Sequence, residues 1–187
     1  MVQFDLKKLF RIPTAAQRLA SLHLRPDLAA AAAKMISDER ADEELKKLDG
    51  CLRPSETVIA VVEGRFARQM GLLTLTTERV SFRPHGSAPR ALTSIPLADI
   101  STVDDEVKTM TGRLILRSTD SIVEIDKILG TQAASFAEAV RHQLVNPGAL
   151  PEHDPIQELL NLRDRRAAGT ISEADYNEAR GRLLDEL

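Results

Sequence analysis

The side chains that could carry out catalysis are scattered along the chain. No H-E-x-x-H motif brings two histidines onto one helix face, and the four histidines lie far apart, at His23, His85, His142 and His153. No G-x-S-x-G motif places a serine nucleophile on a sharp turn, and no G-x-x-x-x-G-K-S/T loop could hold a phosphate. The sequence therefore predicts a protein that is not an enzyme and that holds neither a metal ion nor a cofactor.

A short acidic run has donor atoms that could bind a cation. Asp104, Asp105 and Glu106 follow one another directly in the sequence. Adjacent side chains of an extended chain point to opposite sides, however, so these carboxylates would not converge on one ion. We interpret the run as part of a solvated loop, with cation binding as the alternative.

The composition argues against nucleic acid as a partner. The net charge is −3, whereas phosphate neutralisation needs an excess of basic residues. Five Phe, one Tyr and no Trp are too few for a series of stacking rings. The cluster of Arg163, Arg165 and Arg166 nevertheless keeps a nucleic-acid-associated regulator as a third hypothesis for the function.

Cysteine usage and hydropathy indicate an intracellular location. Cys51 is the single cysteine, so the chain can form neither an internal disulfide nor a cysteine-based zinc site. No apolar run approaches the roughly 18–20 residues of a transmembrane helix. The first residues, MVQFDLKKLFRIP, carry charges where a signal peptide has an apolar stretch. We expect a cytoplasmic protein, with a peripheral membrane location as the alternative.

The middle of the chain has the pattern of short β-strands. Apolar and β-branched segments alternate with turn residues, as in TVIAVVEGRF, GLLTLTTERVSF, RLILRS and SIVEI. One amphipathic helix follows in TQAASFAEAVRHQL. We predict an α+β fold in which residues 55–146 form a seven-stranded open barrel or sandwich, closed by this C-terminal helix. We expect the segment Ser55–Pro147 to fold without either end of the chain.

Helices are predicted on both sides of these strands. Residues 1–54 form an N-terminal helical segment, with an alanine-rich helix that starts at Pro26 and ends near Gly50, or two helices broken near Ser37. A proline-rich linker at residues 147–154 leads to a tail at residues 155–187. The N-terminal part is basic and the tail is acidic, which makes docking of the two ends on each other or head-to-tail assembly of different copies plausible. The tail could meet its own β-domain or another subunit, and we favour the other subunit.

The helix signals of the tail predict a hairpin. Asp154 and Pro155 suit the start of one helix, and Gly169 suits its end. Ser172 and Asp175 suit the start of a second helix. A unit of this size lies below the roughly 40 residues that sustain a core without staples, so the hairpin needs another surface to pack on.

The tail resembles the short C-terminal (SHOCT) domain. The shared features are a leucine-rich helix, a glycine before an Ile-Ser step, an acidic start of the second helix, an aromatic residue and a terminal leucine pair. In this chain these features are Leu159, Leu160, Leu162, Gly169, Ile171, Ser172, Glu173, Tyr176, Leu183 and Leu184. The resemblance implies oligomerisation or docking. The apolar stripes place that contact at Ile156, Leu159, Leu160, Ile171, Tyr176, Leu183 and Leu184.

The middle of the chain is similar to bacterial pleckstrin-homology-like (PH-like) domains. The residues that carry this resemblance are the Pro54-Ser55-Glu56 step, the segment GLLTLTTERVSF, Ile95-Pro96 with Ile100, and Gly112 ahead of an apolar strand. The resemblance implies a binding or assembly module without catalytic residues.

The same resemblance raises contact with anionic lipids. Some pleckstrin-homology domains hold phosphoinositide headgroups with clustered bases near their first two strands. Arg65 and Arg68 lie at that place, but the dense lysine pattern of the family is absent. Ordinary surface arginine is the alternative for both, and also for Arg79, Arg83 and Arg90.

A second lipid contact could come from the N-terminus. Lys7, Lys8 and Arg11 alternate with apolar residues, as in a short interfacial helix. Packing of those apolar residues on the sheet or on a neighbouring subunit is the interpretation that we favour, because one short segment holds a membrane weakly.

These observations lead to three hypotheses for the function. The first is a cytoplasmic assembly or adaptor protein whose tail binds a second copy of the chain or another protein. The second is a peripheral protein that binds or senses phospholipid. The third, a nucleic-acid-associated regulator, is disfavoured by the acidic composition.

Overall fold

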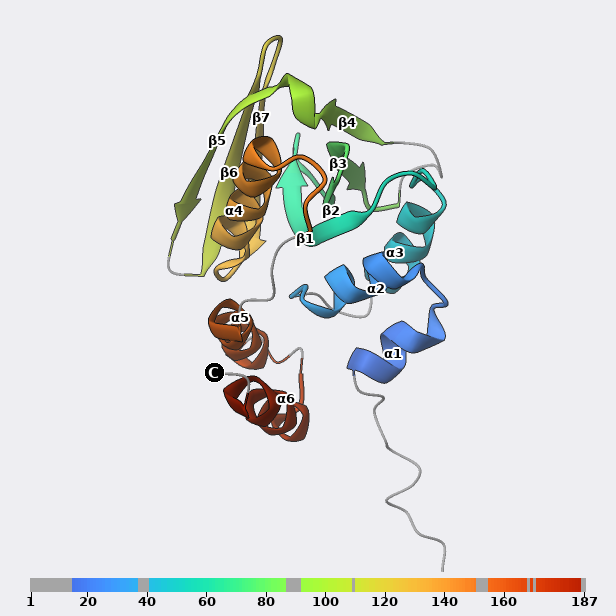
Figure 1. The fold of residues 1–187 in the computed structure, drawn as a ribbon, viewed down its shortest axis with the longest axis vertical. Helices are drawn as coiled ribbons and strands as arrows, with labels where there is room; N and C mark the ends of the chain where they lie inside the picture. Colours follow the sequence, from blue (N-terminus) through green and yellow to red (C-terminus); the bar gives the residue numbers. More distant parts are fainter. Residues whose placement is uncertain are drawn as a thin grey trace, which may run out of the picture.

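Seven strands form the centre of the computed structural model (Figure 1). It describes residues 15–36, 41–86, 92–108, 110–150, 155–167, 169 and 171–185. The strands are β1 (Val58–Phe66), β2 (Gln69–Thr76), β3 (Arg79–Pro84), β4 (Thr93–Pro96), β5 (Ile100–Val107), β6 (Thr111–Ser118) and β7 (Ile122–Leu129). Their order is β4-β3-β2-β1-β7-β6-β5, and every neighbouring pair is antiparallel. β4 and β5 are therefore the edge strands.

The described helices cover both faces of the sheet (Figure 1). They are α1 (Ala15–Ser21), α2 (Pro26–Ala33), α3 (Ala41–Asp49), α4 (Gln132–Val145), α5 (Pro155–Ala167) and α6 (Glu173–Asp185), with a 3-10 turn, η2 (Leu97–Asp99), before β5. α4 packs on the inner face, α2 and α3 pack on the outer face, and α5 and α6 pack against each other. The structure confirms the predicted α+β fold, in which a C-terminal helix closes a seven-stranded sheet and a hairpin follows.

The first apolar core lies between the inner face of the sheet and α4. Leu114 and Leu116 alternate along β6 and meet Phe136 of α4, and all three side chains are buried. Burial of such a side chain contributes about 1.5–3 kcal/mol. Gly112 lets the helix approach closely, because a Cβ atom at this position would lie 2.4 Å from the Cβ of Ala133. The spacing of inward residues on β6 thus fixes where α4 packs.

A second apolar core lies on the outer face of the sheet, beneath α2 and α3. Val61 and Leu72 face outward and meet Leu28, Leu45 and Leu48 from the helices, and all are buried. Eight of the eleven buried side chains in this core precede residue 55. β2 is therefore buried on both faces, which explains its nearly continuous apolar sequence.

A buried ion pair ties α3 to the sheet. Arg83 of β3 is 0% exposed, and its Nη1 donates to Oε2 of Glu44 at 2.5 Å. The other carboxylate oxygen of Glu44 accepts bonds from Lys47 Nζ at 2.8 Å and from the backbone N–H of Gly86 at 3.1 Å. Burial would raise the pKa of Glu44, but these bonds and the nearby positive charges hold it below its usual value. Glu44 is therefore ionised at neutral pH.

A second buried carboxylate joins the start of β1 to the turn between β2 and β3. Glu56 is 0% exposed and accepts bonds from both Nε and Nη2 of Arg79, at 3.0 and 2.7 Å. It also accepts bonds from the Thr76 hydroxyl at 3.0 Å and from the Arg53 backbone N–H at 2.7 Å. On the N-terminal side, Arg25 donates to the backbone carbonyl of Glu56. Every oxygen of this buried carboxylate is thus satisfied.

These contacts correct one interpretation and change one expectation. Arg79 and Arg83 are not surface arginines, because each is buried against a carboxylate; Arg90 lies outside the described residues. The N-terminal helices pack on the sheet, so the predicted boundary after residue 54 falls within one packed body. We therefore no longer expect Ser55–Pro147 to be stable alone.

We predict that the fragment Ser55–Pro147 lacks a cooperative thermal transition, whereas the fragment Ala15–Leu150 melts cooperatively. The shorter fragment exposes Val58, Val61 and Leu72, which the N-terminal helices cover in the full chain. Circular dichroism and calorimetry would measure both transitions. A cooperative melt of Ser55–Pro147 at the temperature of the longer fragment would show that the outer core is dispensable.

We predict that Glu56→Gln destabilises the protein by about 3 kcal/mol at neutral pH, because it leaves Arg79 without its buried counter-charge. Burial raises the pKa of Glu56, but the bonds from Arg79, Arg53 and Thr76 outweigh it and lower the pKa below 4.5. A lowered native pKa stabilises the fold above the unfolded pKa, and this stability disappears as the pH falls through the native value.

The difference in unfolding free energy between wild type and the Glu56→Gln variant should therefore shrink below about pH 4.5. Urea denaturation at a series of pH values would measure it. Glu78→Gln is the matched control, since Glu78 lies next to Arg79 in the chain but is partly exposed, with an ion pair to Arg53. If the difference in unfolding free energy stayed the same at low pH, the assignment of Glu56 as the ionised partner of Arg79 would be wrong.

Candidate functional site

The hairpin α5–α6 forms at the predicted place; Asp154, the expected cap of its first helix, lies outside the described residues. Gly169 adopts a positive φ of 71° after α5, the conformation that a left-handed C-cap requires. At the start of α6, the backbone N–H of Asp175 donates to Ser172 Oγ at 3.1 Å, while Ser172 Oγ donates to the Asp175 carboxylate at 2.8 Å. The Arg166 guanidinium lies 4.6 Å from the centre of the Tyr176 ring and adds a cation–π contact across the seam.

The predicted docking residues divide into two groups. Leu183 is buried in the seam of the hairpin, and Leu159, Leu160, Ile171 and Tyr176 are partly buried. The remaining two are exposed: Ile156 is 59% exposed and Leu184 is 44% exposed. Ile156 lies in the first turn of α5 and Leu184 in the last turn of α6, so a hairpin brings both to its open end.

The hairpin also rests on its own chain through polar contacts from α5. Glu158 forms an ion pair with Lys34, which follows α2, and Asn161 Nδ2 donates to the Lys34 carbonyl at 2.8 Å. Asp164 accepts bonds from Thr131, the residue before α4. Sequence reasoning missed these three α5 residues. Their spacing of three positions was the available signal, since it places them along one helix face.

The bases proposed for lipid contact are not brought together. The Nε and Nη2 atoms of Arg65 donate to Asp126 of β7 at 2.7 and 2.5 Å, and this carboxylate holds the pKa of Arg65 above its usual value. Arg68 is exposed in the two-residue β1–β2 turn, where it has a positive φ of 68°. Lys7, Lys8 and Arg11 lie outside the described residues. Within the described part, Arg68 is therefore the proposed lipid base that remains exposed to solvent.

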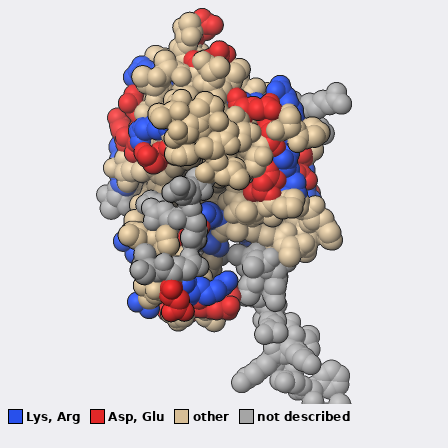
Figure 2. Space-filling model, viewed as in Figure 1, with Lys and Arg blue, Asp and Glu red and all other residues tan. Residues whose placement is uncertain are grey.

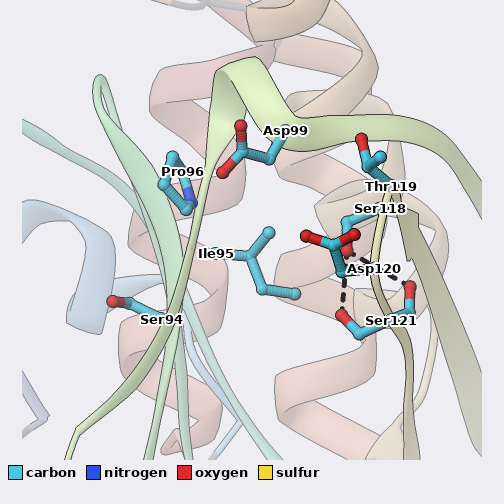
Figure 3. A pocket seen from close by; sticks show the side chains of 8 residues that line it. All are labelled: Ser94, Ile95, Pro96, Asp99, Ser118, Thr119, Asp120 and Ser121. Carbon is cyan, nitrogen blue, oxygen red and sulfur yellow. Dashed lines mark hydrogen bonds between the residues drawn. The ribbon is translucent and has the colours of Figure 1, made fainter.

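A shallow cavity of about 440 Å³ lies between the edge strand β4 and the β6–β7 turn (Figure 3). Serine and threonine hydroxyls and two carboxylates line much of it; the lining residues are Ser94, Ile95, Pro96, Asp99, Ser118, Thr119, Asp120 and Ser121. Ser118 Oγ and Ser121 Oγ lie 2.8 Å apart and bond to each other. The lining contains no basic side chain. Its chemistry therefore disfavours a phosphate or another anion.

The candidate catalytic side chains stay dispersed. His85 Nε2 lies 3.3 Å from Glu63, His23 contacts the carbonyl of nearby Ser21, and His142 lies on α4; His153 lies outside the described residues. Among the described residues, no group of three His, Cys, Asp or Glu side chains is arranged to hold a metal ion. The absence of catalysis remains a prediction.

The acidic run lies in strand β5, so its assignment to a loop is wrong. Asp105 points to the opposite side of the strand from Asp104 and Glu106, as an extended chain requires. Each approaches a different arginine: Asp104 lies 3.6 Å from Arg117, Asp105 lies 2.7 Å from Arg141, and Glu106 lies 3.8 Å from Arg113. These contacts favour a structural role for the run over cation binding.

The arginine cluster of α5 is engaged within the protein. Arg163 pairs with Asp164 at 3.1 Å, and Arg166 pairs with Glu173 at 2.8 Å. Arg165 is partly buried, and this burial lowers its pKa. On the face shown in Figure 2, basic and acidic side chains are interspersed. This arrangement does not favour a nucleic-acid-binding surface.

The comparisons with known proteins bear on the fold alone. No protein-family model matches the chain, and no curated protein matches it. Among solved structures, the N-terminal PH domain of Vps36 is similar, with 20% sequence identity and a TM-score of 0.43. The match covers 51% of this chain and 83% of that chain. None of the described helices is long and apolar enough to cross a membrane.

We predict that Arg68→Gln, and not Arg65→Gln, weakens any binding of this turn to vesicles that contain phosphatidylserine. Arg65 is already paired with Asp126, whereas Arg68 is exposed. Loss of one surface base near an anionic membrane costs about 1 kcal/mol, or roughly a fivefold loss of affinity. Vesicle flotation of both variants would measure this difference. Binding that only Arg65→Gln reduces would contradict it.

Proposed function

We propose that this chain is a non-catalytic assembly or adaptor protein of the cytoplasm, and that the hairpin α5–α6 binds its partner. The partner is a second copy of the chain, with docking on another protein as the alternative. The sheet with its covering helices acts as the rigid support. The resemblance of the tail to SHOCT domains is part of this proposal.

The observation that carries the proposal is the exposed apolar pair at the open end of the hairpin. Ile156 and Leu184 are 59% and 44% exposed, while Leu162 and Leu183 are only 7% and 8% exposed. The polar contacts with the body come from a different set of α5 residues. The open end of the hairpin thus presents two exposed apolar side chains, and the turn that joins its helices is capped.

The two other hypotheses have less support. Arg65 is paired with Asp126, and the cavity beside β4 carries two carboxylates where a phospholipid headgroup would need bases. The arginines of α5 are engaged with Asp164, Glu173 and Tyr176. Membrane and nucleic-acid binding therefore rank below protein–protein contact.

We predict that Ile156→Asp combined with Leu184→Asp lowers the measured mass of the assembly by whole subunits. Each aspartate removes an apolar contact worth about 1 kcal/mol or more, so the dissociation constant of the assembly should rise at least tenfold. Size-exclusion chromatography with light scattering would measure the mass over a concentration series. Circular dichroism should show an unchanged fold, because both positions are exposed.

The matched control combines Ile122→Asp with Val145→Asp. These side chains are 64% and 77% exposed but lie on β7 and α4, away from the hairpin. The control should keep the wild-type mass. A wild type that is already monomeric at tens of micromolar would exclude self-assembly and leave a foreign partner as the remaining form of the proposal.

A further inference from the structure

Helix α4 begins without a cap from its own sequence. Its N-cap residue, Thr131, makes no capping bond with its own side chain, and the first turn contains no acidic residue. The exposed backbone N–H groups at a helix start are partly positive and need acceptors. A helix of fourteen residues that closes the sheet therefore relies on another segment for this function.

Asp164 of α5 supplies one of the missing acceptors, for the N-cap residue. Its Oδ2 accepts the backbone N–H of Thr131 at 3.1 Å and the Thr131 hydroxyl at 2.7 Å. Burial would raise the pKa of Asp164, but the two bonds from Thr131 and the Arg163 guanidinium lower it. The carboxylate is therefore ionised at neutral pH, which suits the positive end of a helix dipole.

Gly130 makes room for this carboxylate. It has a positive φ of 57°, and a Cβ atom at this position would lie 3.0 Å from Asp164 Oδ2 and 3.3 Å from the Cδ1 atom of Ile36. A side chain there would press on the docked Asp164. The turn between β7 and α4 is thus shaped to receive a residue from a distant helix.

The rest of the contact is also polar and lies on one face of α5. Glu158, Asn161 and Asp164 are three residues apart, and the first two reach the side chain and the carbonyl of Lys34. The same carbonyl accepts a bond from Gln132 Nε2 at 2.8 Å, and Gln132 Oε1 accepts the Ile36 backbone N–H at 3.1 Å. The ends of α2 and α4 therefore form one receptor for α5.

We propose that the hairpin is an intramolecular latch, in which α5 closes on the ends of α2 and α4 and Asp164 caps α4 only in the closed state. The latch is held by directional polar bonds, which exchange with water at small net cost. The hairpin can therefore open without unfolding the two apolar cores. Opening removes the cap of α4, so the position of the hairpin is coupled to the end of the helix that closes the sheet.

The closed latch keeps its receptor occupied. A tethered segment acts at an effective concentration of about millimolar. A separate helix with side chains like Glu158, Asn161 and Asp164 at the same spacing therefore competes poorly for the ends of α2 and α4. The latch is thus autoinhibitory toward such a helix. This inference does not require the proposed partner of the open end, because the latch is defined within one chain.

Hydrogen exchange of the full-length protein tests the latch. With Asp164→Asn, the amides in the first turn of α4 and throughout α5 and α6 should exchange at least tenfold faster, while those in β1, β2 and β6 keep their protection. Thr131→Val, which keeps the backbone donor but loses the hydroxyl, should show a smaller change in the same segments. The matched control Asp185→Asn removes an equal charge at the end of α6 and should change neither segment.

Each pattern decides the proposal. Faster exchange in α4 with unchanged α5 and α6 would overturn it, because Asp164 would then cap a helix without holding the hairpin. Unchanged exchange in both segments would overturn it as well. Faster exchange in the strands would show general loss of the fold and also count against a local latch.

A disulfide crosslink between the hairpin and the start of α4 gives an independent test of the closed state. A Cβ atom at Gly130 would lie 3.4 Å from the Cβ of Asp164, close to the separation found in disulfides. Gly130→Cys with Asp164→Cys, in a Cys51→Ser background, should form a disulfide within one chain and slow exchange in α5 and α6 relative to the reduced form. A disulfide between two chains in place of one within the chain would contradict a closed latch.

Discussion

Arg83 lies fully buried on one face of the central sheet, and its charge is balanced by Glu44 from a helix that precedes the sheet in the chain. A buried guanidinium without this partner would cost several kcal/mol, so the strand can keep its place only if α3 is docked. Glu56 imposes a similar constraint at the start of β1, where it engages Arg79. The two pairs lie where the N-terminal segment meets the sheet, beside the second apolar core.

This arrangement decides which surfaces are left for function. Both faces of β2 are covered, the inner face of the sheet holds α4, and the outer face of β1 and β2 holds α2 and α3. The remaining candidates are the edge strands and the hairpin. The edge strand β5 is partly protected, because Arg141 of α4 donates to the Val103 carbonyl at 3.0 Å. The hairpin presents two exposed apolar side chains, Ile156 and Leu184, at its open end, which is why the proposed contact lies there.

The strands and the helix caps could be predicted from the sequence, but the partners of the buried charged residues could not. Alternation and turn residues predicted the seven strands and the closing helix, because these signals are local. Arg79 and Arg83 looked like surface residues, since nothing local shows that carboxylates distant in the chain will meet them. The polar face of α5 was overlooked for the same reason: Glu158, Asn161 and Asp164 gain meaning only when the fold brings Lys34 and Thr131 to them. Contact between different copies remains a prediction, whereas contact of α5 with its own chain is observed.

The distance in sequence between Asp164 and Thr131 has a consequence for synthesis on the ribosome. The two residues are 33 positions apart, so at about 5–20 residues per second Asp164 is made about 2–7 s after the helix start that it caps. Likewise, Glu44 cannot pair with Arg83 until that residue, 39 positions later in the chain, has been made. The nascent chain therefore passes through a stage in which the sheet is complete and the start of α4 is still open to other acceptors. The last helices to emerge end that stage.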